Sequence, residues 1–267
     1  MKRKANNNKK KLLPLYAILI LSLGSMAGFA IALLVEYYTV RQGQAFYSAL
    51  SVDFVPRFGG HSQPNPTGAS GEIAAVREHV PFVDFDEMRE IFPNIVAWIQ
   101  SEGTVINYPI VRGRDNDFYL YHLPDGSRHS MGSIFLDYRN AVNFSDPVIM
   151  IYGHDMRSGD MFGSLRHYAD QNYFEQHYSM YISTPYQNFR LMILAGYVLN
   201  SLYEVPPMYF RSEADFDMYI NNIKSRSVFR SQVDASYGDQ LVLLATCTPG
   251  GSDDERLIIV TRLDDMY

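Results

Sequence analysis

The segment 241–263, LVLLATCTPGGSDDERLIIVTRL, contains two apolar runs separated by a polar loop. The runs 241–246 and 257–261 are continuous rather than alternating in polarity, which predicts strands that are buried on both faces. The intervening residues 248–255 are rich in Pro, Gly, Ser and Asp, as is typical of a loop. We therefore expect the two runs to pair as a β-hairpin.

This hairpin would bring the only cysteine of the chain, Cys247, close to Arg256. Cys247 ends the first strand where Arg256 begins the second, and neighbouring strands lie only about 5 Å apart. A thiol and a guanidinium group would then face one cleft. Cysteine also packs as a small buried hydrophobe, so a core residue and a reactive thiol both remain open interpretations of Cys247.

An apolar segment near the N-terminus predicts a membrane anchor. Residues 12–35 are 24 positions without a formal charge, and about 20 apolar residues suffice to cross a bilayer as a helix. The preceding tail, 1–11, carries six Lys or Arg residues, so the positive-inside rule places it in the cytoplasm and the rest of the chain outside. A cleaved signal peptide is the alternative, although the apolar run exceeds its usual length.

The sequence after the basic tail is acidic and contains a single cysteine. It carries 17 basic and 29 acidic side chains, a formal charge of −12, which argues against nucleic acid as a partner. A disulfide-stabilised exported domain would contain paired cysteines, so this thiol is either inert or reactive. HExxH and paired CxxC motifs do not occur in the sequence, and we expect neither a metal nor another cofactor.

Residues 71–267 are expected to form one mostly β domain, after a stalk and a Pro- and Gly-rich linker at 36–70. Many short strands, few helices and no regular strand–helix alternation favour a β-barrel or sandwich. Strands are expected at 95–100, 105–111, 132–136, 147–152, 178–183, 189–199, 241–246 and 257–261. Helices are expected at 73–79, 84–91, 161–169 and 213–225, with a turn or short helix at 116–122; the 213–225 helix has an apolar stripe of Phe216, Tyr219, Ile220 and Ile223.

His154 is the histidine best placed for chemistry, because it ends an apolar run and begins a glycine-containing loop. A Cys and a His that meet in space form the nucleophile and acid/base pair of thiol acyl-transfer enzymes. The thiolate attacks a carbonyl, the imidazolium protonates the leaving amine, and Arg256 can stabilise the oxyanion. Asp155 is not expected to orient His154, because adjacent strand residues point to opposite faces.

Several separated motifs make the chain resemble the sortase family, and within it class B. The motif LLATC at 243–247, followed by Arg256 in DDERLIIV, resembles the cysteine and arginine strands of the family. IYGHDMRSGDMFGSL at 151–165 resembles the class B histidine motif. GSIFLDYRN at 132–140 and WIQSEGTVINYPIVRGRDNDFYL at 98–120 are also similar to class B segments, so the resemblance covers about 85–263.

The resemblance implies a closed eight-stranded sortase barrel with N-terminal helices and an extra helix before the cysteine strand, which the expected helix at 213–225 matches. It implies a membrane-anchored cysteine transpeptidase on the outer face of a Gram-positive type of envelope. Such an enzyme cleaves a C-terminal sorting signal of secreted proteins, in class B of the N-P-x-T type, and forms a thioester. An amine of a peptidoglycan precursor, or of a pilin, then resolves the thioester.

The resemblance also implies roles for individual residues. Cys247 would be the nucleophile, His154 the general acid/base, and Arg256 the residue that holds substrate and oxyanion. The implied substrate-binding positions flank the cysteine: Ala245, Thr246 and Thr248. The sequence departs from the family pattern at three positions. Leu243 replaces a common Thr, Ala245 stands where some class B members have Ser, and Asp155 replaces a common Asn. Each departure predicts an altered preference for the sorting signal.

Other functions remain open on the sequence alone. A pilin-polymerising sortase would use the same residues with a different acceptor. A cysteine endopeptidase would transfer the acyl group to water only. A non-catalytic anchored scaffold would keep Cys247 as a core residue.

Overall fold

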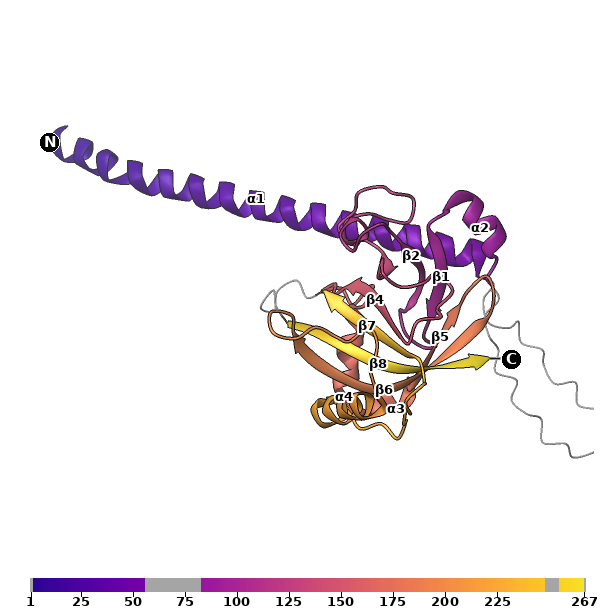
Figure 1. Cartoon of the computed structure of the whole chain (residues 1–267). Coiled ribbons are helices and arrows are strands. Elements are labelled where there is room, and N and C mark those ends of the chain that lie inside the picture. Colours follow the sequence, from indigo (N-terminus) through magenta and orange to yellow (C-terminus); the bar gives the residue numbers. More distant parts are fainter. Residues whose placement is uncertain (1, 56–82, 248–254, 267) are drawn as a thin grey trace, which may run out of the picture. The chain divides into compact units, whose positions relative to one another are not determined.

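The computed structural model describes residues 2–55, 83–247 and 255–266 (Figure 1). The chain forms two compact units, Met1–Ala45 and Phe46–Tyr267. The helix expected at 73–79, nearly all of the Pro- and Gly-rich linker and the predicted site residue Thr248 lie outside the described residues.

The first unit consists of the N-terminal part of one long helix, α1 (Lys2–Phe54). Its large apolar side chains are exposed, from Tyr16 to Tyr38. Within the described ranges, α1 is the one helix that is long and apolar enough to cross a membrane. The length, apolar composition and exposure of α1 therefore agree with the membrane anchor expected at 12–35. Large exposed apolar surfaces mark sites that bind a membrane or another protein.

The second unit contains a closed barrel in which the described strands follow the order β1-β2-β3-β4-β7-β8-β6-β5 (Figure 1). Neighbouring strands are antiparallel except for two parallel pairs, β2 with β3 and β4 with β7. The strands are β1 (Ile95–Gln100), β2 (Asn107–Arg112), β3 (Ile134–Leu136), β4 (Val148–His154), β5 (Ser179–Ser183), β6 (Asn188–Asn200), β7 (Leu241–Cys247) and β8 (Glu255–Met266). The prediction of a closed eight-stranded, mostly β barrel is confirmed for the described residues.

The helices of this unit decorate the barrel. They are α2 (Phe85–Ile91), η1 (Phe118–Leu120), η2 (Gly163–Ala169), α3 (Gln171–Gln176) and α4 (Glu213–Arg226). Asp84 caps α2, because its carboxylate accepts a hydrogen bond of 3.2 Å from the backbone N–H of Glu87. Ser212 caps α4 in the same way, through the N–H of Asp215 at 3.2 Å.

Three elements differ from the sequence-based expectation, and one of them, α3, was not predicted. The segment 161–169 contains only the 3₁₀ helix η2, because Met161 has a left-handed backbone with φ of 54° and cannot begin a regular helix. Strand β8 is longer than the apolar run 257–261, since it pairs with β6 from Glu255 to Met266.

Strand β7 is buried on both faces, as its continuous apolar run predicts. Alternate side chains, Val242 and Leu244, join the cluster that fills the barrel. The other set packs in a second cluster beneath α4, which contains Leu241, Leu243, Ala245, Phe216, Ile220 and Ile223. The stripe predicted for the 213–225 helix therefore docks α4 on the outside of the barrel.

The last turns of α1 belong to the barrel unit, which begins upstream of the boundary expected near residue 70. Tyr47, Leu50 and Phe54 are buried in the same cluster that fills the barrel, with Val55. Their spacing of i, i+3 and i+7 is that of one helix face. This end of α1 is therefore part of the folded core rather than a stalk.

Replacing Leu50 by Ala should lower the free energy of unfolding by about 2–5 kcal/mol, because a buried leucine leaves a cavity. The exposed neighbour Val52 provides the control, and Val52→Ala should change stability by less than about 0.5 kcal/mol. The measurement is denaturant unfolding of the full chain in micelles, followed by the fluorescence of the only tryptophan, Trp98, which is buried in the barrel. Equal effects of the two substitutions would contradict the placement of α1 in the core.

Candidate active site

The parallel pairing of β4 with β7 sets His154 directly opposite Cys247. Each of the two residues is the last of its strand. The two predicted site positions are thus brought together by a ladder of seven consecutive pairs that begins at Val148 and Leu241. The strand ends place both positions at one rim of the barrel.

Arg256 approaches the same rim through the hairpin of β7 and β8. In the antiparallel register Ala245 lies opposite Ile258, and the same register continued by two residues sets Cys247 opposite Arg256. The hydroxyl of Thr246 holds this end of the hairpin, because it accepts from the N–H of Leu257 at 3.1 Å and donates to its carbonyl at 3.3 Å.

The three positions share one face of the sheet. Side chains alternate along a strand, and Tyr152, Ala245 and Ile258 pack with the cluster beneath α4. His154, Cys247 and Arg256 are each two residues away from one of these, so their positions fall on the same outer face. The structure therefore brings together the three positions that the sequence predicted for the site, Cys247, His154 and Arg256.

His154 is held by a backbone carbonyl. Its Nε2 lies 2.5 Å from the carbonyl oxygen of Leu120, and because a carbonyl can only accept, Nε2 carries the proton of this hydrogen bond. Nδ1 is then the ring nitrogen without a proton in the neutral imidazole. Burial lowers the pKa of His154, while the hydrogen bond to Leu120 opposes that change.

The loop after His154 is fixed by an arginine. Arg166 forms an ion pair with the carboxylate of Asp155 and donates to the carbonyls of Met156 and Gly163, each at 2.7 Å. The carboxylate of Asp155 thus serves to fix the loop. This agrees with the expectation that Asp155 does not orient His154.

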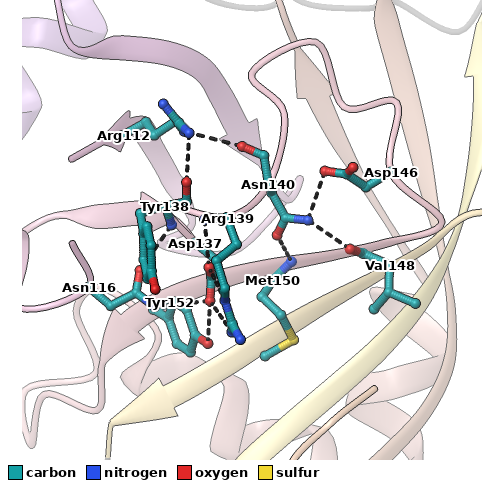
Figure 2. A network of polar contacts seen from close by, with 10 residues as sticks. All are labelled: Arg112, Asn116, Asp137, Tyr138, Arg139, Asn140, Asp146, Val148, Met150 and Tyr152. Atoms are coloured by element: carbon teal, nitrogen blue, oxygen red, sulfur yellow. Dashed lines mark hydrogen bonds and ion pairs between the residues drawn. The ribbon is translucent and has the colours of Figure 1, made fainter. Parts of the chain in front are cut away.

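A buried carboxylate, that of Asp137, contacts Tyr152 of β4 and was not found by sequence reasoning (Figure 2). Tyr152, two residues before His154 on β4, donates to Asp137 at 3.0 Å. Arg139 binds the same carboxylate with Nε at 2.9 Å and Nη2 at 2.7 Å, and Asn116 donates at 2.9 Å. The only signal in the sequence is that Asp137 follows the apolar run of β3, at a strand end.

These contacts determine the charge states of Asp137 and Tyr152. Burial raises the pKa of Asp137, but Arg139, Asn116 and Tyr152 outweigh it and lower the pKa to about 2. Burial and the Asp137 charge raise the pKa of Tyr152, and the positive charge of Arg256 opposes that rise. Tyr152 therefore remains a neutral donor between the buried carboxylate and Arg256.

The predicted substrate-binding positions are not equivalent in the structure. Ala245 lies on the outer face with His154, where only 1% of it is exposed. Thr246 alternates to the inside of the barrel, is 2% exposed and binds Leu257, so its side chain is turned away from that face. Arg256 is half-buried. No group of three metal-ligating side chains occurs among the described residues.

Comparisons with known proteins give close relatives, although no family model matches the chain. Sortase B of Listeria monocytogenes is 34% identical over 182 residues, which are 67% of this chain and 74% of that protein. The crystal structure of sortase B from Bacillus anthracis in complex with AAEK1 matches with a TM-score of 0.70 and 26% identity, covering 86% of this chain and 100% of that one. A sortase B–substrate complex from Staphylococcus aureus matches with a TM-score of 0.65 and 26% identity, covering 68% and 85%.

Asp137 should make the fold sensitive to acid. Its pKa is about 2 in the folded chain against an ordinary value of 3.8, so its contacts stabilise the fold above about pH 4, and this gain is lost as the pH falls toward 2. The shift corresponds to about 2 kcal/mol. In the original chain, the free energy of unfolding should therefore fall by this amount between pH 6 and pH 2. In Asp137→Asn, this part of the fall should be absent.

The matched control is Asp217→Asn, at an exposed position of α4, which should keep the pH dependence of the original chain. An Asp137→Asn variant with unaltered acid sensitivity would show that the buried carboxylate does not carry this stability.

Proposed function

Because this chain belongs to the class B sortases, which are cysteine transpeptidases of cell-wall anchoring, we propose that Cys247, His154 and Arg256 are its catalytic residues. The observation that carries this proposal is the register of β4 and β7, which pairs His154 with Cys247. The register of the hairpin adds Arg256 from the other side of β7.

In the first half of the reaction, the sulfur of Cys247 attacks the carbonyl carbon of the scissile peptide bond in the sorting signal. Neutral His154 accepts the thiol proton at Nδ1 and returns it to the leaving amine as the C–N bond breaks. The acyl group remains on the sulfur as a thioester. Arg256 stabilises the negative charge that develops on the carbonyl oxygen.

In the second half, an amine of the cell wall attacks the thioester. The C–S bond breaks, the amine gives a proton to Nδ1 of His154, and this proton passes to the departing sulfur, which restores the thiol of Cys247 and neutral His154. A thioester reacts readily with amines, so a bound acceptor amine outcompetes water without a completely closed site. A peptidoglycan precursor supplies this amine, and a pilin amine is the alternative.

The substrate is a secreted protein with a C-terminal sorting signal of the N-P-x-T type, as the class B resemblance implies. A relative with the same fold forms a substrate complex, which supports binding of the signal on this barrel. Here the segment that leaves β6 beside Arg256 exposes three large apolar residues, Leu202, Tyr203 and Val205. They offer an apolar surface to a peptide next to the catalytic positions.

The N-terminal helix anchors the enzyme, with the basic tail in the cytoplasm and the barrel outside. The exposed apolar residues of α1 and the basic tail that precedes them support this orientation. An anchor confines the enzyme, a membrane-arrested substrate and a lipid-linked acceptor to one plane. Their effective concentrations rise as a result.

Cys247→Ala should abolish cleavage of an N-P-x-T peptide, with a loss of at least about 10³-fold, because no other residue supplies the nucleophile. The fold should be unchanged by circular dichroism and Trp98 fluorescence. Mass spectrometry with an added amine should show the aminolysis product from the unsubstituted chain. Turnover by Cys247→Ala would refute the proposal, and water as the sole acceptor would indicate an endopeptidase.

Arg256→Ala should reduce kcat by about 10²- to 10³-fold, the effect of removing one donor to an oxyanion. Arg262→Ala is the matched control, because Arg262 lies on the same strand and pairs with Asp264 at 2.7 Å instead. Peptide-cleavage kinetics on both variants measure the difference. Equal kcat values for the two variants would remove Arg256 from the catalytic set.

A further inference from the structure

Tyr47 reaches from α1 into the turn that lies behind the catalytic histidine. It is only 3% exposed, and its hydroxyl donates to the carbonyl of Gly132 at 2.5 Å. The same oxygen lies 3.4 Å from the hydroxyl of Ser133. An α1 side chain therefore fixes the two residues that precede β3.

Ser133 forms hydrogen bonds with two carbonyl groups, one on either side of Leu120 in the sequence. Its N–H donates to the carbonyl of Tyr119 at 2.8 Å, and its hydroxyl donates to the carbonyl of His122 at 2.8 Å. The carbonyl between them, that of Leu120, accepts the proton of His154 Nε2. One residue thus connects the Tyr47 contact with the peptide groups around the acceptor of His154.

Gly132 shows how closely these backbones approach. Its φ is +55°, and a Cβ added at this position would lie 2.4 Å from the Leu120 oxygen and 2.6 Å from the Tyr119 oxygen. Only glycine fits in this arrangement. The Gly132 turn therefore packs directly against the Leu120 carbonyl, and a side chain at residue 132 would displace that carbonyl.

A second contact leads from Tyr47 to the loop after the histidine. The ring of Tyr47 packs edge-on against Tyr108, with centroids 5.3 Å apart. The Tyr108 hydroxyl accepts from the N–H of Met161 at 3.1 Å, and the next residue, Phe162, donates to the carbonyl of His154 at 3.0 Å. Contacts therefore lead from Tyr47 to the Leu120 carbonyl, which accepts from the His154 ring, and to the backbone carbonyl of His154 itself.

We propose that Tyr47 is a positioning residue for the transpeptidation reaction. Its hydroxyl fixes the Gly132–Ser133 turn, which places the Leu120 carbonyl, and that carbonyl orients the ring of His154 so that Nδ1 faces the reacting atoms. The inference rests on the proposed role of His154. It assigns to α1 a part in catalysis besides its proposed part in anchoring.

The test compares Tyr47→Phe with Tyr38→Phe in the full chain in micelles. Phenylalanine keeps the ring packing against Tyr108 and removes only the hydroxyl, while Tyr38 is an exposed residue of the same helix. Tyr47→Phe should lower kcat for peptide cleavage about three- to tenfold with KM within about twofold, the effect of one misplaced hydrogen bond. Tyr38→Phe should leave both constants unchanged.

Two further variants complete the experiment. Gly132→Ala should lower kcat more than Tyr47→Phe, because its methyl group displaces the Leu120 oxygen. The His154→Ala variant tests the proposed function itself, because activity in this variant would refute the role of His154. If His154→Ala is inactive and Tyr47→Phe has a normal kcat, only the inference about Tyr47 is overturned. Lower stability of Tyr47→Phe with unaltered kcat would also overturn it, since it would show a purely structural contact.

Discussion

The parallel register of β4 and β7 is the constraint on which the site depends. A slip of one residue would turn every side chain of a strand to the other face, and would separate His154 from Cys247. Gly153 opposes such a slip. A Cβ at this position would lie 2.4 Å from Ile134 and 2.8 Å from Phe162, so neither Tyr152 nor His154 can occupy the place of Gly153 inside the barrel.

The rim of the barrel needs polar restraints that the apolar core cannot supply. Apolar contacts are not directional, whereas proton transfer requires atoms within hydrogen-bond distance. Polar contacts meet this need: the Leu120 carbonyl at His154, the Asp137 carboxylate at Tyr152, and Arg166 in the loop after β4. A catalytic group held by such a supporting layer keeps one orientation.

Sequence reasoning located the strands and the catalytic positions because these depend on local patterns. The continuous run of β7, the stripe of α4 and the strand end at His154 are each visible in a short window. Two partners of Asp137 are not visible in such a window, because Asn116 and Tyr152 meet it only after the chain has folded. The order of strands around the barrel is likewise a property of distant pairings.

The domain boundary expected near residue 70 rests on the Pro- and Gly-rich composition of the linker, whereas the barrel unit begins at Phe46. Tyr47, Leu50 and Phe54 have a helical spacing, but no pattern in the sequence shows that this helix face packs in the barrel core. The left-handed Met161 was equally hidden, since backbone conformation there is imposed by the contact with Tyr108. Local propensity yields to tertiary contacts at both places.

The position of the β7–β8 hairpin in the barrel also determines the order in which His154 and Cys247 are added as the fold is completed. β7 pairs with β4, and β8 pairs with β6, so without the hairpin both β4 and β6 are open sheet edges. Cys247 is carried by the same segment that closes these edges. A chain that has formed only its first six strands contains the imidazole of His154 but not the thiol, and Cys247 arrives only with the segment that completes the fold.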